Sequence, residues 1–142
     1  MKEITLPATI ENVEKATEFV NEELEKIKCP PKAKAEIDVA IDELFSNIAN
    51  YAYNPHIGKV TMKLEIQDNP LAVIITFMDN GIPYDPLKKA DPNIKLSADD
   101  REIGGLGVFM VKKSMDSVEY EYKDNHNILK IKKNIDVKGE TK

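Results

Sequence analysis

Glu43 and Asn47 stand four residues apart in a segment whose apolar residues recur at helical spacing. Residues with this separation are neighbours on one face of a helix. The pair offers a carboxylate that can accept a proton and an amide oxygen that can bind a hard cation such as Mg²⁺. Alone, the spacing is also typical of a solvated helix face, so it indicates a site only if other motifs converge on it.

A second candidate lies at Asp79-Asn80-Gly81, directly after the apolar run Leu71–Met78. A carboxylate at the end of a buried strand can accept a hydrogen bond from an exocyclic amine, and Gly81 lets a flat base approach the backbone. Asn-Gly is also a hairpin turn signal. The hairpin interpretation is weakened because the following residues, with Pro83 and Pro86, make a poor strand.

A third candidate, Gly104-Gly105-Leu106-Gly107, opens a predicted helix. The free N–H groups and the dipole of a helix start favour an anion such as phosphate, although a simple loop-to-helix junction has the same composition. The P-loop pattern is absent because no Gly-Lys-Ser/Thr follows. The dinucleotide fingerprint fails because no strand precedes the glycines and Met110 replaces its last glycine.

The long segment between the second and third candidates, from Asp79 to Ile103, has no sustained periodicity and contains Arg101. Segments of this length without regular structure are uncommon in a domain and often serve as lids. Its composition fits a disordered insertion equally well.

Periodicity predicts the elements that position these motifs. We expect strands at Lys2–Leu6, Lys59–Gln67, Leu71–Met78, Ser117–Lys123 and Asn127–Ile135, and helices at Thr9–Ile27, Lys32–Tyr53 and Gly104–Met115. This order predicts an α+β fold, a two-layer sandwich with a mostly antiparallel mixed sheet and helices on one face.

The whole chain narrows the function classes. Its 142 residues fit one domain, 1–142, and a net charge of −5 argues against a nucleic-acid partner. Lys112–Lys113 and Lys132–Lys133 are interpreted as solvated faces. Cys29 is the sole cysteine, so no intrachain disulfide forms. With no signal-peptide pattern and no apolar run of about 20 residues, we expect a cytoplasmic protein without a membrane partner.

The three motifs, in this order, resemble those of the GHKL-type ATPases with the Bergerat ATP-binding fold. Asp42-Glu43-Leu44-Phe45-Ser46-Asn47 resembles the N box of that family. The stretch from Asp79 to Pro86 resembles its first glycine box, and Gly104 to Val111 its second. The resemblance covers nearly the whole chain and is greatest to the small bacterial anti-sigma factor serine/threonine kinases.

The resemblance implies a role for each matched residue. Asp79 would bind the adenine amino group, with room provided by Gly81, and Asn47 would bind Mg²⁺. Glu43 would be the general base. The phosphates of ATP would be bound by the N–H groups of a run comprising Gly104, Gly105, Leu106, Gly107 and Val108.

Family members often carry a basic residue where this chain has Asn50 or Tyr51. Arg101, on an ATP lid at approximately 82–103, is expected to supply positive charge near the phosphates instead. A lysine or the metal alone are the alternatives.

The leading hypothesis is therefore an ATP- and Mg²⁺-dependent kinase that phosphorylates a serine or threonine of a protein antagonist and also binds a sigma factor. The resemblance also suggests a homodimer. A nucleotide-controlled protein-binding module without kinase turnover is the alternative, and an interaction protein without a ligand is a third possibility.

Overall fold

The computed structural model describes residues 1–52, 58–88 and 103–135. Along the chain the elements are β1 (Lys2–Pro7), the 3₁₀ turn η1 (Ile10–Asn12), α1 (Val13–Lys26), α2 (Pro31–Asn47), the π-helix η2 (Ile48–Ala52), β2 (Lys59–Gln67), β3 (Ala72–Asp79), the 3₁₀ turn η3 (Pro86–Lys88), α3 (Ile103–Ser114), β4 (Ser117–Lys123) and β5 (His126–Asn134).

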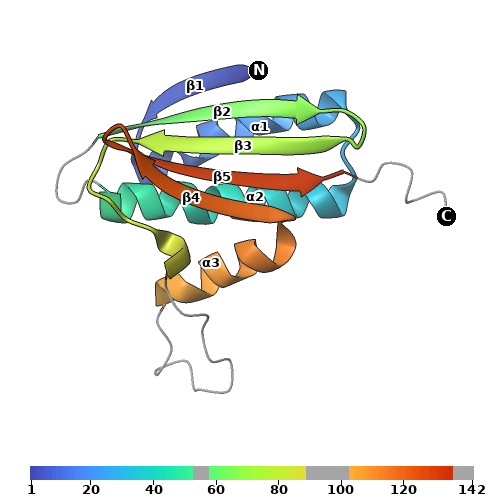
Figure 1. The fold of residues 1–142 in the computed structure, drawn as a ribbon. Coiled ribbons are helices and arrows are strands. Elements are labelled where there is room, and N and C mark those ends of the chain that lie inside the picture. The colour runs from blue at the N-terminus through green and yellow to red at the C-terminus, as the bar shows by residue number, and fades with distance from the viewer. Residues whose placement is uncertain (53–57, 89–102, 136–142) are drawn as a thin grey trace, which may run out of the picture.

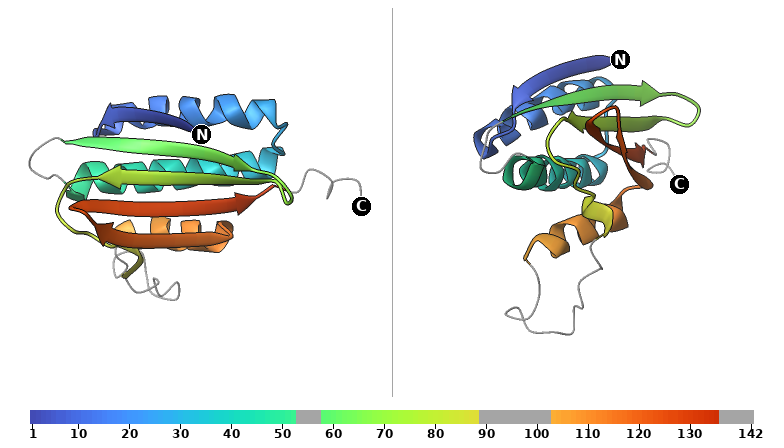
Figure 2. Two further views of the ribbon diagram at one scale, coloured as in Figure 1. Left: turned by 45° about the horizontal axis from the view of Figure 1, so that its top comes forward. Right: turned by 60° about the vertical axis from the view of Figure 1, so that its left-hand side comes forward.

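The described strands form one sheet in the order β1-β2-β3-β5-β4, in which every pair is antiparallel. All three α-helices lie on one face of this sheet, with α1 toward β1, α2 across the middle and α3 toward β4 (Figure 1, Figure 2). The predicted α+β sandwich with helices on one face is confirmed, and the sheet is fully antiparallel rather than mixed.

Strict alternation in β2, β3 and β5 creates the core. Every second residue of these strands faces the helices, and the residues between face the uncovered side. The inward-facing strand residues pack against the apolar faces of α1 and α2. The fully buried side chains of the resulting core include Val20, Leu24, Ile37, Ile41, Leu44, Val60, Met62, Leu64, Ile75, Phe77 and Ile131. Each such side chain contributes about 1.5–3 kcal/mol relative to exposure.

Helix α2 lies in the centre of the helix layer and supplies the first motif. Pro30 has an extended backbone before the helix, and Pro31 occupies its first turn, where a missing N–H costs nothing. The predicted single helix to Tyr53 is wrong in detail, since the α-helix ends at Asn47 and continues as the π-helix η2. Short π-helical segments are frequent at functional sites.

Helix α3 contains the third motif and begins at Ile103, one residue before its first glycine. Val108 and Val111 are buried beneath it, whereas Met110 is about half exposed. None of the described helices has the length and apolar character needed to cross a membrane.

Candidate functional site

Asp79 is the last residue of β3 and belongs to the inward-facing row of that strand. Its side chain is buried, and its Oδ1 accepts hydrogen bonds from the backbone N–H of Gly81 at 3.0 Å and from Nδ2 of Asn127 at 2.8 Å. Within the described part of the chain, no donor reaches Oδ2. Burial raises the pKa of Asp79, while the hydrogen bonds from Asn127 and Gly81 act in the opposite direction. One carboxylate oxygen is thus fixed by two hydrogen bonds, and the other could accept a further one.

Asn127 holds Asp79 in this orientation. It lies directly opposite Asp79 in the β3–β5 pairing and is also buried. Its Nδ2 also donates to the carbonyl of Ile82 at 2.9 Å, and its Oδ1 accepts from the N–H of Tyr84 at 3.0 Å and from the hydroxyl of Tyr120. A buried amide with all its hydrogen bonds made is a rigid support.

Sequence reasoning missed Asn127. The available signal was a polar residue in the inward row that it shares with Leu129 and Ile131, where only apolar side chains were expected.

The two tyrosines beside this network are also additions to the predicted site. The ring of Tyr84 stacks on that of Tyr51 with their centroids 5.3 Å apart. Tyr51 belongs to η2 and Tyr84 follows β3, so the ring contact joins η2 to the segment after Asp79.

A cavity lies between α2, η2 and the ends of β3, β4 and β5. Apolar and aromatic residues form most of its wall, and Asn47, Asp79 and Asn127 contribute amide and carboxylate groups. The remaining lining residues are Leu44, Ile48, Ala52, Tyr84, Pro86, Tyr120 and Leu129. Mostly apolar walls with a few converging polar groups are typical of ligand sites.

The cavity is narrow in this structure, with free room for about one water molecule. A planar ligand can enter only if lining side chains move. Tyr84 and Pro86 are the lining residues that belong to the start of the predicted lid. A wider hollow of about 410 Å³ lies on the uncovered face of the sheet, and charged and polar side chains make up most of its lining residues.

Gly81 lies tightly against the π-helix η2. A Cβ atom at this position would stand 2.3 Å from the carbonyl oxygen of Ala52, and the N–H of Ile82 donates to that same oxygen at 2.9 Å. Any side chain would therefore collide with backbone. The glycine is required by this close approach, irrespective of whether a base also needs the space.

Glu43 and Gly107 meet at the contact between α2 and α3. A Cβ atom on Gly107 would lie only 1.8 Å from Oε2 of Glu43, so the carboxylate lies directly over the glycine backbone. Burial, followed by the neighbouring charge of Asp42, raises the pKa of Glu43. A carboxylate with a raised pKa is a stronger proton acceptor than an ordinary glutamate.

Asn47 is buried one helical turn after Glu43, and its Nδ2 has no hydrogen-bond partner. A buried polar group left unpaired costs about 1–3 kcal/mol. Such a group in the cavity wall points to a polar ligand. Across the described ranges, no cluster of three His, Cys, Asp or Glu side chains could hold a metal ion. A cation here would therefore combine the Asn47 amide oxygen with oxygens of a bound phosphate, as Mg²⁺ commonly does.

The remaining predicted residues are positioned only in part. Gly104, Gly105 and Leu106 fall in the first turn of α3, the part of a helix that leaves N–H groups without an intrahelical partner. Gly107 and Val108 come about one turn later. Arg101 and most of the predicted lid lie outside the described residues.

The helix-covered antiparallel sheet, with the three motifs gathered beside α2, defines the ATPase class that the motifs resemble. Residues 6–133 match the family model of the histidine kinase-like ATPase domain, and the chain belongs to this family.

Curated relatives are protein kinases by name. The chain is 28% identical over 93 residues to the serine/threonine-protein kinase BtrW of Bordetella bronchiseptica, a match covering 66% of this chain and 65% of that protein. It is 24% identical over 101 residues to the serine-protein kinase RsbW of Bacillus thuringiensis, covering 68% of this chain and 62% of the relative. The chain thus spans slightly less than two thirds of the length of each.

Proposed function

We propose that this chain binds ATP with Mg²⁺ and transfers the γ-phosphoryl group to a serine or threonine of a partner protein. The observation that carries the proposal is the position of the Glu43 carboxylate, directly over Gly107 of α3 and one turn from the buried amide of Asn47. A base, a cation ligand and the glycine-rich start of a helix are the parts that phosphoryl transfer requires.

The base of ATP would occupy the cavity beside Asp79. The free Oδ2 of Asp79 would accept a hydrogen bond from the adenine amino group, since Oδ1 already accepts two. Guanine presents a carbonyl oxygen at the same place and would be repelled. The small room in the cavity implies that Tyr84 moves when the base enters.

The triphosphate would extend from this cavity toward the first turn of α3, which contains Gly104, Gly105 and Leu106, because the N–H groups at a helix start favour anions. The amide oxygen of Asn47 would hold Mg²⁺, which neutralises phosphate charge when bound. We further propose that the N–H groups of Gly107 and Val108 and the side chain of Arg101 contribute to phosphate binding in the complex.

In the transfer step, the acceptor hydroxyl oxygen would form a bond to the γ-phosphorus while the bond from that phosphorus to the bridging oxygen of ADP breaks. The Glu43 carboxylate would take the hydroxyl proton. Burial holds the pKa of Glu43 above its usual range, which favours this proton transfer.

The relatives BtrW and RsbW are named serine/threonine- and serine-protein kinases, which supports the choice of acceptor. From the motif resemblance, we propose that the acceptor belongs to an anti-sigma factor antagonist, that the chain also binds a sigma factor, and that it acts in the cytoplasm as a homodimer. We propose neither nucleic acid nor a membrane as a partner.

One observation favours the alternative, a nucleotide-controlled binding module. No lysine or arginine of the described residues lines the cavity, and Asn50 and Tyr51 stand where relatives often carry a basic residue. Without a basic side chain near the phosphates, nucleotide binding could occur without efficient phosphoryl transfer.

Purification of the chain with its native partners, followed by incubation with γ-labelled ATP, separates the two functions. Label on a serine or threonine of a co-purifying protein, absent with Glu43→Ala, is the result expected of a kinase. Mg-ATP binding without any label would support the binding module, and the absence of nucleotide binding would refute both.

A further inference from the structure

Lys133 is the one inward-facing lysine of β5, on the same side of the strand as Leu129 and Ile131. The interpretation of Lys132–Lys133 as a solvated face is therefore wrong for Lys133, whose side chain is only 18% exposed. Alternation along β5 could have revealed this, because residues 129, 131 and 133 share one face.

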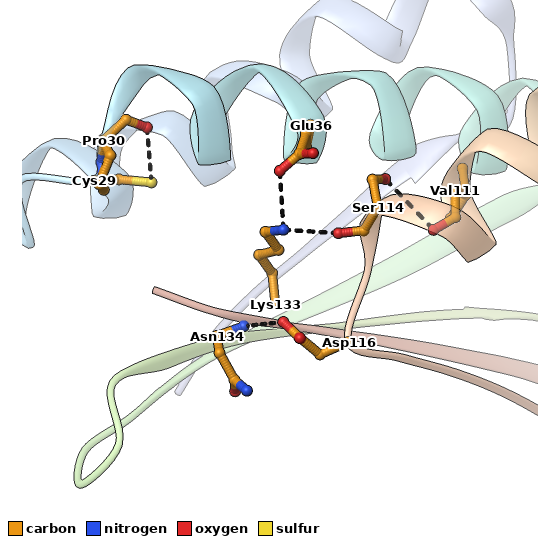
Figure 3. Close-up of polar contacts among 8 residues, drawn as sticks. All are labelled: Cys29, Pro30, Glu36, Val111, Ser114, Asp116, Lys133 and Asn134. Carbon is orange, nitrogen blue, oxygen red and sulfur yellow. Dashed lines mark hydrogen bonds and ion pairs between the residues drawn. The ribbon is translucent and has the colours of Figure 1, made fainter. Parts of the chain in front are cut away.

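The ammonium group of Lys133 joins three elements. Its Nζ lies 2.9 Å from Oε1 of Glu36 on α2 and donates to the backbone carbonyl of Ser114, the last residue of α3, at 2.7 Å (Figure 3). A lysine at the end of a helix satisfies one of its free carbonyls and complements the helix dipole. Charge-assisted hydrogen bonds of this kind are directional and stronger than neutral ones.

The chain just beyond α3 is fixed to β5 as well. The N–H of Asp116 donates to the carbonyl of Lys132 at 2.8 Å. The Oδ2 of Asp116 accepts from the N–H of Asn134 at 2.6 Å (Figure 3). The end of α3 is thus held to the sheet by one backbone and one side-chain hydrogen bond of Asp116, and Lys133 adds the link to α2.

The contact made through Lys133 and the contact between Glu43 and Gly107 are separated by the same number of residues on α2 as on α3. Glu36 precedes Glu43 by seven residues on α2, and Gly107 precedes Ser114 by seven residues on α3. Seven residues of α-helix measure about 10.5 Å. The two helices therefore meet at Glu43–Gly107 and, through Lys133, at Glu36–Ser114, with matched spacing along their axes.

Because a helix is rigid, sliding of α3 at one contact is passed to the other. The buried side chains of Val108, Val111 and Met115 hold α3 against the core. Apolar burial is non-directional, so it restrains the position of α3 along its axis less sharply than directional hydrogen bonds do. The directional bonds of Lys133 can fix it.

We infer that Lys133 is a positioning residue that sets where the start of α3 lies relative to Glu43. The inference rests on the proposed function for its consequence, since this placement decides how the phosphates of ATP meet the proposed base. Lys133 itself lies at the opposite end of α3 and contacts neither the proposed phosphate site nor Glu43.

Titration of the Glu43 side chain reports the position of α3 directly. Contact with α3 contributes to the burial that raises the pKa of Glu43, and Asp42 is the charged neighbour that contributes from α2. Gly107 brings no charge from α3. If α3 slides away, Glu43 gains solvent and its pKa falls toward the ordinary value of about 4.3.

The test follows the carboxyl ¹³C signal of Glu43 against pH in Lys133→Met, which keeps the aliphatic stem but loses the charge and the donors. We expect the pKa of Glu43 to fall. Loss of the distant positive charge alone would move that pKa upward, so the two causes have opposite signs. Lys133→Arg should restore the wild-type titration. Lys130→Met, which removes a lysine on the uncovered face of the same strand, should leave it unchanged.

The same variants are then titrated with Mg²⁺ and AMP-PNP by calorimetry. Lys133→Met should weaken binding by between about twofold and thirtyfold, the range in which residues that couple distant sites act. Lys133→Gln, which keeps donors but not the charge, serves as a milder variant if the methionine variant does not fold.

An unchanged or raised Glu43 pKa in a folded Lys133 variant overturns the inference. Wild-type protein that binds no nucleotide refutes the proposed function instead, and the Glu43 titration then still decides whether Lys133 positions α3.

Discussion

Replacing Gly107 with alanine separates the chemistry of this site from its stability. The new Cβ would stand 1.8 Å from Oε2 and 2.2 Å from Cδ of Glu43, whereas ordinary contacts begin at 3.4 Å. The carboxylate must therefore retreat by about 1.6 Å, the difference between 3.4 and 1.8 Å. A displacement of about 1 Å at a reacting group can lower a rate about 100-fold.

Stability should move in the opposite direction. Gly107 lies inside α3, and alanine in a helix interior is about 0.5–1 kcal/mol more favourable than glycine. Since the carboxylate is the end of a flexible side chain, moving it costs little. We expect Gly107→Ala to melt at the wild-type temperature or about 2–4 °C above it.

The assay measures transfer of label from γ-labelled ATP to the co-purified partner, alongside AMP-PNP affinity and thermal melting. Transfer should fall about 100-fold, and affinity should change little because Asp79 is unaffected. In a Glu43→Ala background, Gly107→Ala should have no further effect on transfer. Full transfer activity of Gly107→Ala would refute the placement of Glu43 as the base.

Further predictions concern the other polar groups. Asp79→Asn should weaken ATP binding by at least about tenfold, because an adenine amine then loses a charged acceptor; unchanged affinity in calorimetry would exclude the base contact. Asn47→Ala should weaken ATP binding with Mg²⁺ present but much less with EDTA, and equal losses would contradict the ligand role. Since the raised pKa of Glu43 disfavours its charged form in the folded state, Glu43→Gln should raise the melting temperature at pH 7, with the gain shrinking as pH falls through that pKa. A gain that persists at low pH would show that burial of the charge is not its cause. For the same reason, the fall in the transfer rate at acidic pH should have its midpoint above about pH 4.3, the ordinary pKa of glutamate.

Alternation of apolar residues was sufficient to predict the sheet. β2 and β4 have the predicted bounds, β1 is one residue longer at its end, and β3 and β5 are each shifted by one residue at both ends. The prediction of the strands succeeded because the sheet has one buried and one open face, so apolar and polar residues alternate in β2.

Helix ends were less predictable. The first helix was expected to begin at Thr9, but α1 begins at Val13 after a 3₁₀ turn, and the side chain of Thr9 makes no capping bond. Its hydroxyl oxygen instead accepts from Nδ2 of Asn12 at 3.0 Å. Such choices among equivalent local hydrogen bonds are decided by the surrounding structure.

The supports of the site depend on pairing between strands. Asn127 matters because it lies opposite Asp79, and Lys133 matters because β5 lies beneath both α2 and α3. Neither fact follows from local sequence. The motifs at Glu43, Asp79 and Gly107 could be recognised because the residues that characterise each motif are only a few positions apart in the sequence.

A crystal structure with Mg²⁺ and AMP-PNP tests the central claim most directly. We predict adenine in the cavity with its amino group on Oδ2 of Asp79, Tyr84 displaced, and the phosphates against the first turn of α3, within reach of Glu43 and Asn47. A nucleotide bound elsewhere, with Asp79 Oδ2 unpaired and the N–H groups at Gly104–Leu106 without phosphate contact, would contradict it.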